Sequence, residues 1–265
     1  MLKSLIKHSL FAVAPQTATA LMSARARAHS QRLVKEWGLY EINQRLIKEL
    51  GSRVVTGPFR GVQLTPLTWN EHIGPFILGT YEVELYPWWQ QVFEQSFDAI
   101  IDVGAKFGYY AIGLALRFPS ALTIAFDTDW WARQAIREMA AANHVRNLSV
   151  KGYCSPAWLK ENLRANTFLV SDCEGYEGDL LCTLEIAAMA SATLLVELHE
   201  NEAPGVTSRI ESRFRETHVI SRVPARSAPA APDDLRIASL TQEEIHRASN
   251  EIRLPEQEWL FLTPR

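Results

Sequence analysis

The chain has 265 residues, a formal net charge of −3 at pH 7, and a composition that is 47% hydrophobic and 22% charged. These values are typical of a globular protein with one large or two small domains. The small negative charge gives no reason to expect nucleic acid or an anionic membrane as a partner, and no apolar run reaches the roughly 18 residues of a membrane span. Three cysteines without metal-type pairing (Cys154, Cys173 and Cys182) favour a reducing, cytoplasmic location over a disulfide framework.

The N-terminal segment is basic and has no acidic residue before Glu36. Its apolar side chains would share one face of a helix: Leu2, Leu5, Ile6, Leu10 and Val13. We expect an amphipathic helix that packs on the core or on a second copy of the chain in a homo-oligomer. Two alternatives stay open, a transit peptide and a helix that makes weak contact with a membrane surface.

The region before the predicted sheet contains three elements. Ala18–Leu50 is predicted to be helical and to end at Gly51, Arg53–Leu64 to form a short hairpin, and Pro87–Gln95 to form a short helix that begins with proline. We therefore predict an N-terminal helical extension and hairpin over residues 1–95, followed by a second domain over residues 96–265. His72, in a loop-like segment between these elements, is expected at the surface.

From Phe97 onward, strand-like and helix-like stretches alternate. The predicted strands are Phe97–Gly104, Leu122–Asp127, Leu148–Tyr153, Thr167–Cys173 and Ala192–Leu198. The predicted helices are Tyr109–Arg117, Trp130–Asn143, Pro156–Leu163, Gly178–Met189 and Val206–Arg215. Alternation of this kind predicts an α/β fold with a parallel sheet covered by helices on both faces.

Two further strands are predicted near the end of the chain, His218–Val223 and Glu258–Thr263. The Pro/Ala-rich loop Pro224–Pro232 and the polar helix Gln242–Asn250 separate them. Because there is no clear strand–helix–strand crossover between them, we expect an antiparallel pair at one edge. The complete prediction is a mostly parallel seven-stranded sheet with a terminal antiparallel strand pair.

A glycine-containing turn connects the first predicted strand to the helix that follows it. The turn runs from Asp102 through Gly104, Ala105 and Gly108 to Tyr109, and glycines allow a ligand to approach the backbone closely. Asp127 follows Gly108 at close to the roughly 20-residue separation expected of a carboxylate that binds ribose hydroxyls. The pattern favours a site for a nucleoside-containing ligand over an ordinary strand–helix–strand unit with an exposed acid.

Four motifs in this order resemble those of the FkbM-type methyltransferases. They are Asp102–Tyr110, Ala125–Asp127, Asp172–Glu177 and Val196–His199, and the upstream Gly79–Glu82 also resembles the family. The resemblance implies the Rossmann-like methyltransferase fold, S-adenosylmethionine (SAM) as cofactor, and O-methylation of a hydroxyl on a glycan or small-molecule natural product. The implied cofactor-binding residues are Asp102, Gly104, Ala105, Gly108, Tyr109, Asp127 and Asp172.

Candidate catalytic residues follow the fourth and fifth predicted strands, whose carboxyl ends lie at the ligand-binding edge of such sheets. A hydroxyl acceptor must lose its proton during methyl transfer, and His199 is the first candidate for this general base, with Asp172 the second. A hydrogen-bonded structural histidine is the alternative for His199. Asp172, Glu174 and Glu177 with His199 could also hold a divalent cation, but no ligand spacing is diagnostic, so no metal is predicted.

Two positions depart from the family pattern. Lys106 stands where the family usually has asparagine, and Asp127 stands where it usually has glutamate. Because Lys106 places a cation beside the turn, the alternative function is a non-catalytic SAM- or nucleotide-binding module that acts as a partner or scaffold. A nicotinamide oxidoreductase is disfavoured, since the turn lacks the middle glycine that lets the backbone meet a pyrophosphate.

Overall fold

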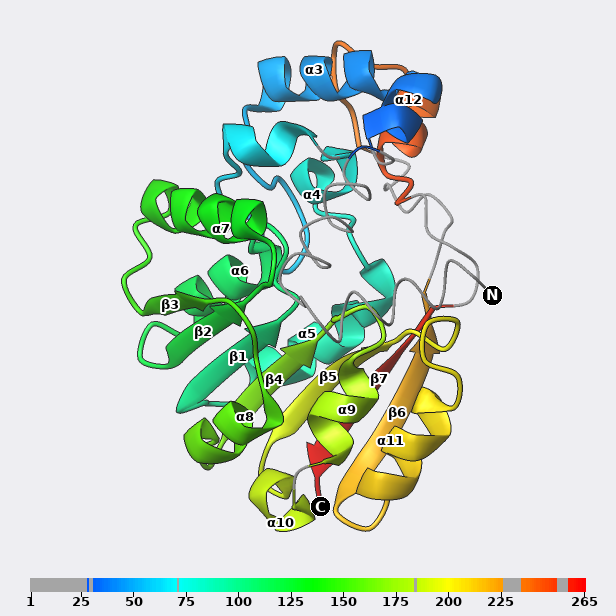
Figure 1. The fold of residues 1–265 in the computed structure, drawn as a ribbon. Coiled ribbons are helices and arrows are strands. Elements are labelled where there is room, and N and C mark those ends of the chain that lie inside the picture. The colour runs from blue at the N-terminus through cyan, green and yellow to red at the C-terminus, as the bar shows by residue number, and fades with distance from the viewer. Residues whose placement is uncertain (1–27, 29–30, 71, 184, 226–234, 252–256) are drawn as a thin grey trace.

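The computed structural model describes residues 28, 31–70, 72–183, 185–225, 235–251 and 257–265. Its centre is a seven-stranded sheet in the order β3-β2-β1-β4-β5-β7-β6. The strands are β1 (Ala99–Val103), β2 (Leu122–Phe126), β3 (Leu148–Lys151), β4 (Thr167–Ser171), β5 (Thr193–Leu198), β6 (His218–Pro224) and β7 (Glu258–Pro264). Figure 1 shows the sheet with its helices.

The strand directions confirm the predicted fold class. β1 pairs in parallel with β2 and β4, and β4 pairs in parallel with β5. β7 is antiparallel to both β5 and β6, with Leu260 opposite Val196 and Leu262 opposite Ile220. The predicted terminal pair is therefore present, with the last strand inserted between β5 and β6. This is the α/β, Rossmann-like arrangement expected from the sequence.

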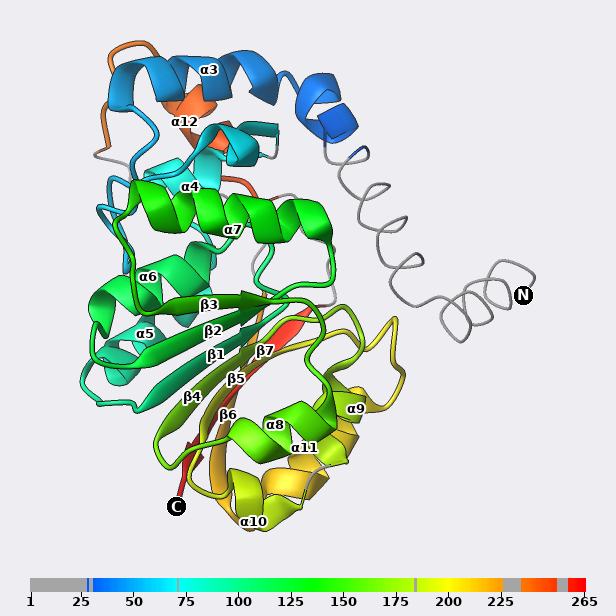
Figure 2. The same cartoon turned by 60° about the vertical axis from the view of Figure 1, so that its left-hand side comes forward.

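Helices cover both faces of the sheet (Figure 2). One face carries α5 (Tyr86–Phe93), α6 (Tyr109–Arg117) and α7 (Trp130–Ala142), and the other carries α8 (Pro156–Asn162), α9 (Glu177–Cys182), α10 (Ile186–Met189) and α11 (Val206–Phe214). Two helix starts follow from the sequence, since Asp129 accepts a hydrogen bond from the Trp131 backbone N–H and Ser155 accepts one from that of Trp158.

The central strands β1, β4 and β5 are buried on both faces, and their alternate side chains enter two separate core clusters. Ile100 and Phe168 belong to the cluster under α5 and α6, whereas Ile101 and Leu169 belong to the cluster under α9 and α11. This alternation follows from the two-residue repeat of a strand, and burial on both sides is what a parallel sheet covered by helices requires.

A layer of helices lies beyond α7 (Figure 1). It contains α3 (Leu39–Leu50), the 3₁₀ helix Pro66–Asn70, α4 (Gly74–Leu78) and α12 (Gln242–Ala248), while the 3₁₀ helix Val83–Leu85 leads into α5. α12 comes from the C-terminal part of the chain but lies beside α3, where Arg45 pairs with Glu244. Glu49 accepts hydrogen bonds from the backbone N–H groups of Ala238 and Ser239.

The N-terminal region and the sheet share hydrophobic packing. Phe59, from the predicted hairpin, contacts Trp89 of α5 and both Tyr109 and Tyr110 of α6. Gly113 of α6 leaves room for this ring, because a Cβ there would lie 2.1 Å from Phe59 Cδ1. The boundary between residues 95 and 96 stays a prediction.

Three predicted elements differ in the structure. The predicted helix Ala18–Leu50 is interrupted, since residues 31–36 are helical but Gly38 (φ 62°) separates them from α3. In Arg53–Leu64 a single antiparallel bridge joins Arg53 and Gln63 instead of a paired hairpin, because the intervening turns carry Phe59 into the core. Gly178–Met189 forms two helices, α9 and α10, instead of one.

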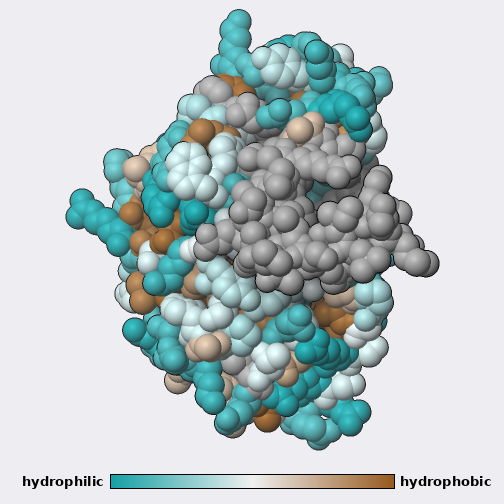
Figure 3. Space-filling model, viewed as in Figure 1, coloured by the Kyte–Doolittle hydropathy of each residue, from teal (hydrophilic) through white to brown (hydrophobic). Residues whose placement is uncertain are grey.

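Two regions singled out in the sequence fall outside the described residues. They are the amphipathic N-terminal segment and most of the Pro/Ala-rich loop, residues 226–232. Among the described residues, none of the helices combines the length and apolarity needed to cross a lipid bilayer. On the coloured part of the face in Figure 3, hydrophobic residues form small patches separated by hydrophilic ones.

His72 is buried, contrary to the surface position expected from the sequence. Only 8% of it is exposed, and its Nε2 lies 2.8 Å from the backbone oxygen of Asn250. A carbonyl only accepts, so Nε2 carries the hydrogen and the buried Nδ1 has no hydrogen-bond partner among the described residues. Burial lowers the pKa of His72 to about 4, although the bond to Asn250 opposes this shift.

The lowered pKa of His72 predicts a loss of stability in acid. The unfolded chain binds a proton at this histidine near pH 6.5, whereas the folded chain binds it only near pH 4. The free energy of unfolding therefore decreases as the pH falls from 6.5 to about 4. We expect His72 to account for about 2–3 kcal/mol of the unfolding free energy lost between pH 7 and pH 4.5. Urea unfolding at both pH values should show a smaller loss for His72→Gln, whose amide can still donate to Asn250. Equal losses would contradict the assignment.

Candidate functional site

Gly104 brings the ends of β1 and β4 into direct backbone contact. Its φ of 88° lies in the left-handed region, and a Cβ there would lie 1.6 Å from the backbone oxygen of Asp172. The backbone N–H of Asp172 donates to the oxygen of Val103 at 2.9 Å. Only glycine meets both requirements, so this residue places Asp172 directly against the turn.

Asp127 connects the same turn to the end of β2 through hydrogen bonds. Its Oδ2 accepts a hydrogen bond from the Lys106 backbone N–H at 2.9 Å, and its Oδ1 accepts one from Asp129 N–H at 2.8 Å. Each carboxylate oxygen has a second lone pair, which a ribose hydroxyl could use. Burial raises the pKa of Asp127 to about 6, although its two hydrogen bonds and the charge of Arg133 oppose the shift.

A pocket opens where the turn meets α4, the loop after it and the end of β4. Its lining residues are Phe76, Tyr81, Asp102, Gly104, Ala105, Lys106, Phe107, Tyr109, Tyr110 and Asp172. Asp102 is 2% exposed, and its Oδ2 has no hydrogen-bond partner within the described part of the chain. Burial, followed by the charge of Asp172, raises the pKa of Asp102 to about 8. The pocket is therefore suited to a group that donates to Asp102 or carries positive charge.

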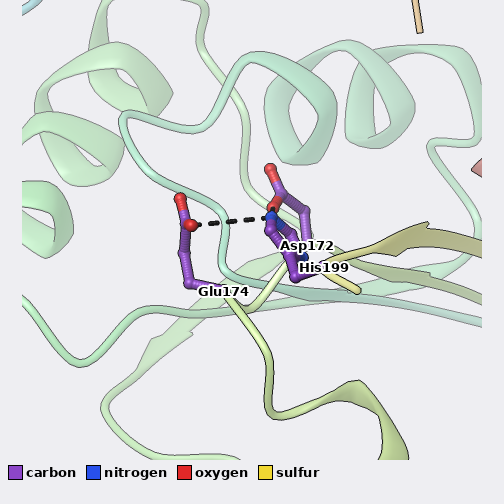
Figure 4. Close-up of side chains that lie close together, drawn as sticks. All are labelled: Asp172, Glu174 and His199. Atoms are coloured by element: carbon purple, nitrogen blue, oxygen red, sulfur yellow. Dashed lines mark ion pairs between the residues drawn. The ribbon is translucent and has the colours of Figure 1, made fainter. Parts of the chain in front are cut away.

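His199, at the end of β5, lies among carboxylates. Its Nδ1 is 2.8 Å from Glu177 Oε1, while its Nε2 is 3.6 Å from Asp172, 3.5 Å from Glu174 and 3.7 Å from Glu197. Figure 4 shows the carboxylates of Asp172 and Glu174 directed toward the His199 ring. Burial alone would lower the pKa of His199, but the hydrogen bond to Glu177 and the surrounding carboxylates raise it to about 9.

Glu177 determines how the His199 ring is oriented. Glu177 is fully buried and also accepts hydrogen bonds from the backbone N–H groups of Cys173 at 3.0 Å and Gly175 at 3.1 Å. Burial would raise the pKa of Glu177, but its bond and charge interaction with His199 leave that pKa below its ordinary value. Because Glu177 is an acceptor on every side, His199 Nδ1 must donate to it. Nε2 therefore points toward the other carboxylates.

Two further acids near the pocket did not figure among the site residues proposed from the sequence. Glu82 is fully buried, accepts a hydrogen bond from the Tyr110 hydroxyl, and its backbone N–H donates to Glu251 Oε1 at 2.7 Å. Burial, followed by the charge of Glu251, raises the pKa of Glu82 well above its ordinary value. Glu82 belongs to the Gly79–Glu82 motif, and this motif could have identified it from the sequence. Glu251 follows a polar helix, and no motif in the sequence pointed to it.

The structure brings most of the predicted site residues together. Five of them line the pocket: Asp102, Gly104, Ala105, Tyr109 and Asp172. Gly108 is the N-cap residue of α6, Asp127 joins the pocket through Lys106 N–H, and His199 adjoins Asp172. Tyr109 also packs against Phe59 and Phe76, so its ring belongs to the core as well.

The tryptophan pairs of the chain lie away from this pocket. Trp88 and Trp89 are buried, where Trp88 stacks on Phe261 of β7 and Trp89 contacts Phe168 of β4. Trp130 is 64% exposed at the start of α7 and does not line the pocket. The aromatic side chains that do line the pocket come from α4, from the loop after it, from the glycine turn and from the start of α6.

The sheet order and the site at its edge place the chain in the Rossmann-like α/β class. No protein-family model matches the chain, and no curated protein matches it in sequence, so membership of the FkbM-type family is not shown.

Solved structures of methyltransferases resemble the chain at a distance. They include a precorrin-6y C5,15-methyltransferase from Geobacter metallireducens, with 12% identity, a TM-score of 0.43, and coverage of 64% of this chain and 82% of that chain. The O-methyltransferase TomG from Streptomyces achromogenes, in complex with SAM, has 13% identity, a TM-score of 0.42, and coverage of 66% and 76%. TYW2 from M. jannaschii, in complex with AdoMet, has 10% identity, a TM-score of 0.41, and coverage of 66% and 72%. These similarities are too distant to assign an activity or a substrate to this chain.

Proposed function

We propose that the chain is a SAM-dependent methyltransferase of the FkbM type that methylates a hydroxyl group on a glycan or small-molecule natural product. One observation carries the cofactor assignment: the buried Asp102 Oδ2 has no hydrogen-bond partner in the described chain and lies in the same pocket as Asp172 and the glycine turn. SAM carries a sulfonium and an ammonium group, and either would be stabilised beside these two carboxylates. We assign Asp127, across the turn, to the ribose hydroxyls, whose hydrogen bonds its carboxylate oxygens could accept in addition to those of Lys106 and Asp129 N–H.

The charge of the pocket also favours binding of SAM over binding of a nicotinamide or other pyrophosphate-containing cofactor. A pyrophosphate at the glycine turn would lie close to Asp172, whose negative charge repels it, and it would further oppose ionisation of the buried Asp102. SAM contains no phosphate, so it avoids this repulsion. The same argument disfavours a nucleic-acid acceptor, whose phosphates would approach Glu174 and Asp172 at the sheet edge.

We assign uptake of the hydroxyl proton to Asp172 and a supporting role to His199, because a pKa of about 9 leaves the His199 ring largely protonated at pH 7. Bound SAM supplies a methyl group already activated on sulfur and leaves as a neutral thioether, so the protein has only to orient the acceptor and take up its hydroxyl proton. The side chain of Asp172 is 32% exposed and that of His199 is 2% exposed. An acceptor therefore reaches the carboxylate of Asp172 first, and His199 lies behind it with its ring held by Glu177. We also propose a cytoplasmic location, on the basis of three free cysteines.

The cofactor site predicts a specific pH dependence of binding. The charges that face Asp127 are those of Asp129, Arg133 and Asp102. With a pKa of about 6, Asp127 is mostly protonated at pH 5, and a protonated carboxyl offers less acceptor capacity to the ribose hydroxyls. We expect the Kd for SAM to be about tenfold higher at pH 5 than at pH 7.5. Calorimetric titration of SAM at both pH values measures this difference.

Asp127→Asn is the matched variant, because its side chain has the same shape but does not titrate. It should bind SAM at least tenfold more weakly at pH 7.5 and show little further loss at pH 5. NAD is titrated in parallel and should not bind. The absence of saturable SAM binding to the wild type would overturn the proposed function, and SAM binding without methyl transfer to any hydroxyl acceptor would support the non-catalytic alternative.

A further inference from the structure

The Nε2 atom of His199 is a buried nitrogen with oxygen atoms of three carboxylates within 4 Å. It makes no hydrogen bond within the described residues, although its side chain is 2% exposed. Nδ1 donates to Glu177, so in the neutral ring Nε2 presents a lone pair to Asp172, Glu174 and Glu197. Three carboxylates around one nitrogen require a compensating positive charge, which either a proton on Nε2 or a bound cation can supply.

The distances favour a metal ion over a proton as that charge. The separations of 3.5, 3.6 and 3.7 Å between Nε2 and the three carboxylate oxygens exceed the roughly 2.7–3.2 Å of an N–H···O hydrogen bond. A cation bound at about 2.1 Å from each ligand atom holds neighbouring ligands about 3.0–3.4 Å apart. The ligand atoms of Asp172, Glu174 and His199 all lie within 4.8 Å of one another. Small side-chain movements would complete the coordination.

We propose that Asp172, Glu174 and His199 bind one divalent cation. Glu197, 3.7 Å from Nε2, lies close enough to contribute directly or through water. The Glu177–His199 pair has the arrangement common in metal proteins, in which a carboxylate accepts from one ring nitrogen while the other binds the metal. One imidazole with several carboxylates suits Mn²⁺, which accepts both nitrogen and oxygen ligands.

The cation would explain how so many carboxylates gather at one edge of the sheet. Asp172 lies against the cofactor pocket, so a cation bound to it is adjacent to the space where a hydroxyl acceptor must enter. There the cation would bind the hydroxyl oxygen and lower its pKa. This catalytic role rests on the proposed function, whereas binding of the cation does not.

The test is a titration of the purified full-length chain with Mn²⁺ alone, followed by electron paramagnetic resonance. The signal of free Mn²⁺ should decrease with a stoichiometry of one ion per chain. The spin-echo modulation of the bound ion should show a directly coordinated ¹⁴N nucleus. His199→Asn should lose that modulation and weaken binding at least tenfold, and Glu177→Gln should weaken it about tenfold through the ring orientation.

His144→Asn is the matched control, because His144 is exposed on a distant loop whose left-handed backbone asparagine tolerates. It should leave affinity and modulation unchanged, and circular dichroism checks that each variant is folded. Binding that lacks nitrogen modulation, binding that survives His199→Asn, or no binding at millimolar Mn²⁺ would each overturn the site. Neither SAM nor an acceptor is present, so such a failure leaves the methyltransferase proposal intact.

Discussion

Gly104→Ala is expected to destabilise the protein by about 4 kcal/mol or more. The new Cβ would lie 1.6 Å from the backbone oxygen of Asp172, and that oxygen cannot move away without separating the ends of β1 and β4. The positive φ of 88° adds backbone strain for any residue with a Cβ. Urea unfolding gives the change in free energy, and calorimetry shows whether the remaining folded protein has lost SAM binding.

Gly205→Ala distinguishes the effect of the close Cβ contact from the effect of the positive φ. Gly205 has a similar φ of 85°, but nothing lies within 4 Å of a Cβ placed on it. This variant carries the backbone strain alone, and we expect it to cost about 1 kcal/mol. If Gly104→Ala costs no more than Gly205→Ala, the close contact between the glycine turn and Asp172 is wrong.

The second large effect concerns Gly113→Ala. Its change in the free energy of unfolding should be unfavourable when residue 59 is Phe and favourable when residue 59 is Ala. Gly113 has ordinary helical geometry, and a Cβ on it would lie 2.1 Å from Phe59 Cδ1. In the wild type we expect Gly113→Ala to cost about 2 kcal/mol through overpacking. In the Phe59→Ala background the ring is gone, and the same substitution should stabilise by up to about 1 kcal/mol because alanine is the better helix former.

The measurement is a double-mutant cycle by urea unfolding. Phe59→Ala alone should cost about 4 kcal/mol, since the ring is buried among four other aromatic side chains. The coupling energy between the two sites should be about 3 kcal/mol. A coupling near zero would mean that Phe59 does not pack on α6. It would then favour an N-terminal region that folds independently of the sheet.

The strands β1, β2 and β4 were predictable because each is a short, mostly apolar run followed by a glycine or an acid. Helices cover both faces of the sheet at its centre, so β1 and β4 are nearly continuous hydrophobic stretches in the sequence, as Ile100 and Ile101 illustrate. The N-terminal layer was not predictable in the same way. The break at Gly38, α4 and the path of Phe59 depend on packing against α12 and α6, which lie far away in the sequence.

The candidate site was predictable where the residues sit at strand ends, because parallel strands end at one edge of the sheet. Asp102, Asp127, Asp172 and His199 were all placed by that rule. The local sequence could not show which ring nitrogen of His199 is free, because this depends on Glu177 folding back from the start of α9. Nor could it show that Glu82 and Glu251 meet, since their contact spans the whole sheet domain.

The position of β7 between β5 and β6 has a consequence for synthesis on the ribosome. When the nascent chain has emerged only as far as β6, the outer edge of β5 has no partner and β6 has no strand beside it. At the same stage α3 still lacks α12, the helix that later lies against it. Open strand edges can pair with other chains, so we expect the incomplete protein to be prone to misassociation until β7 has left the exit tunnel.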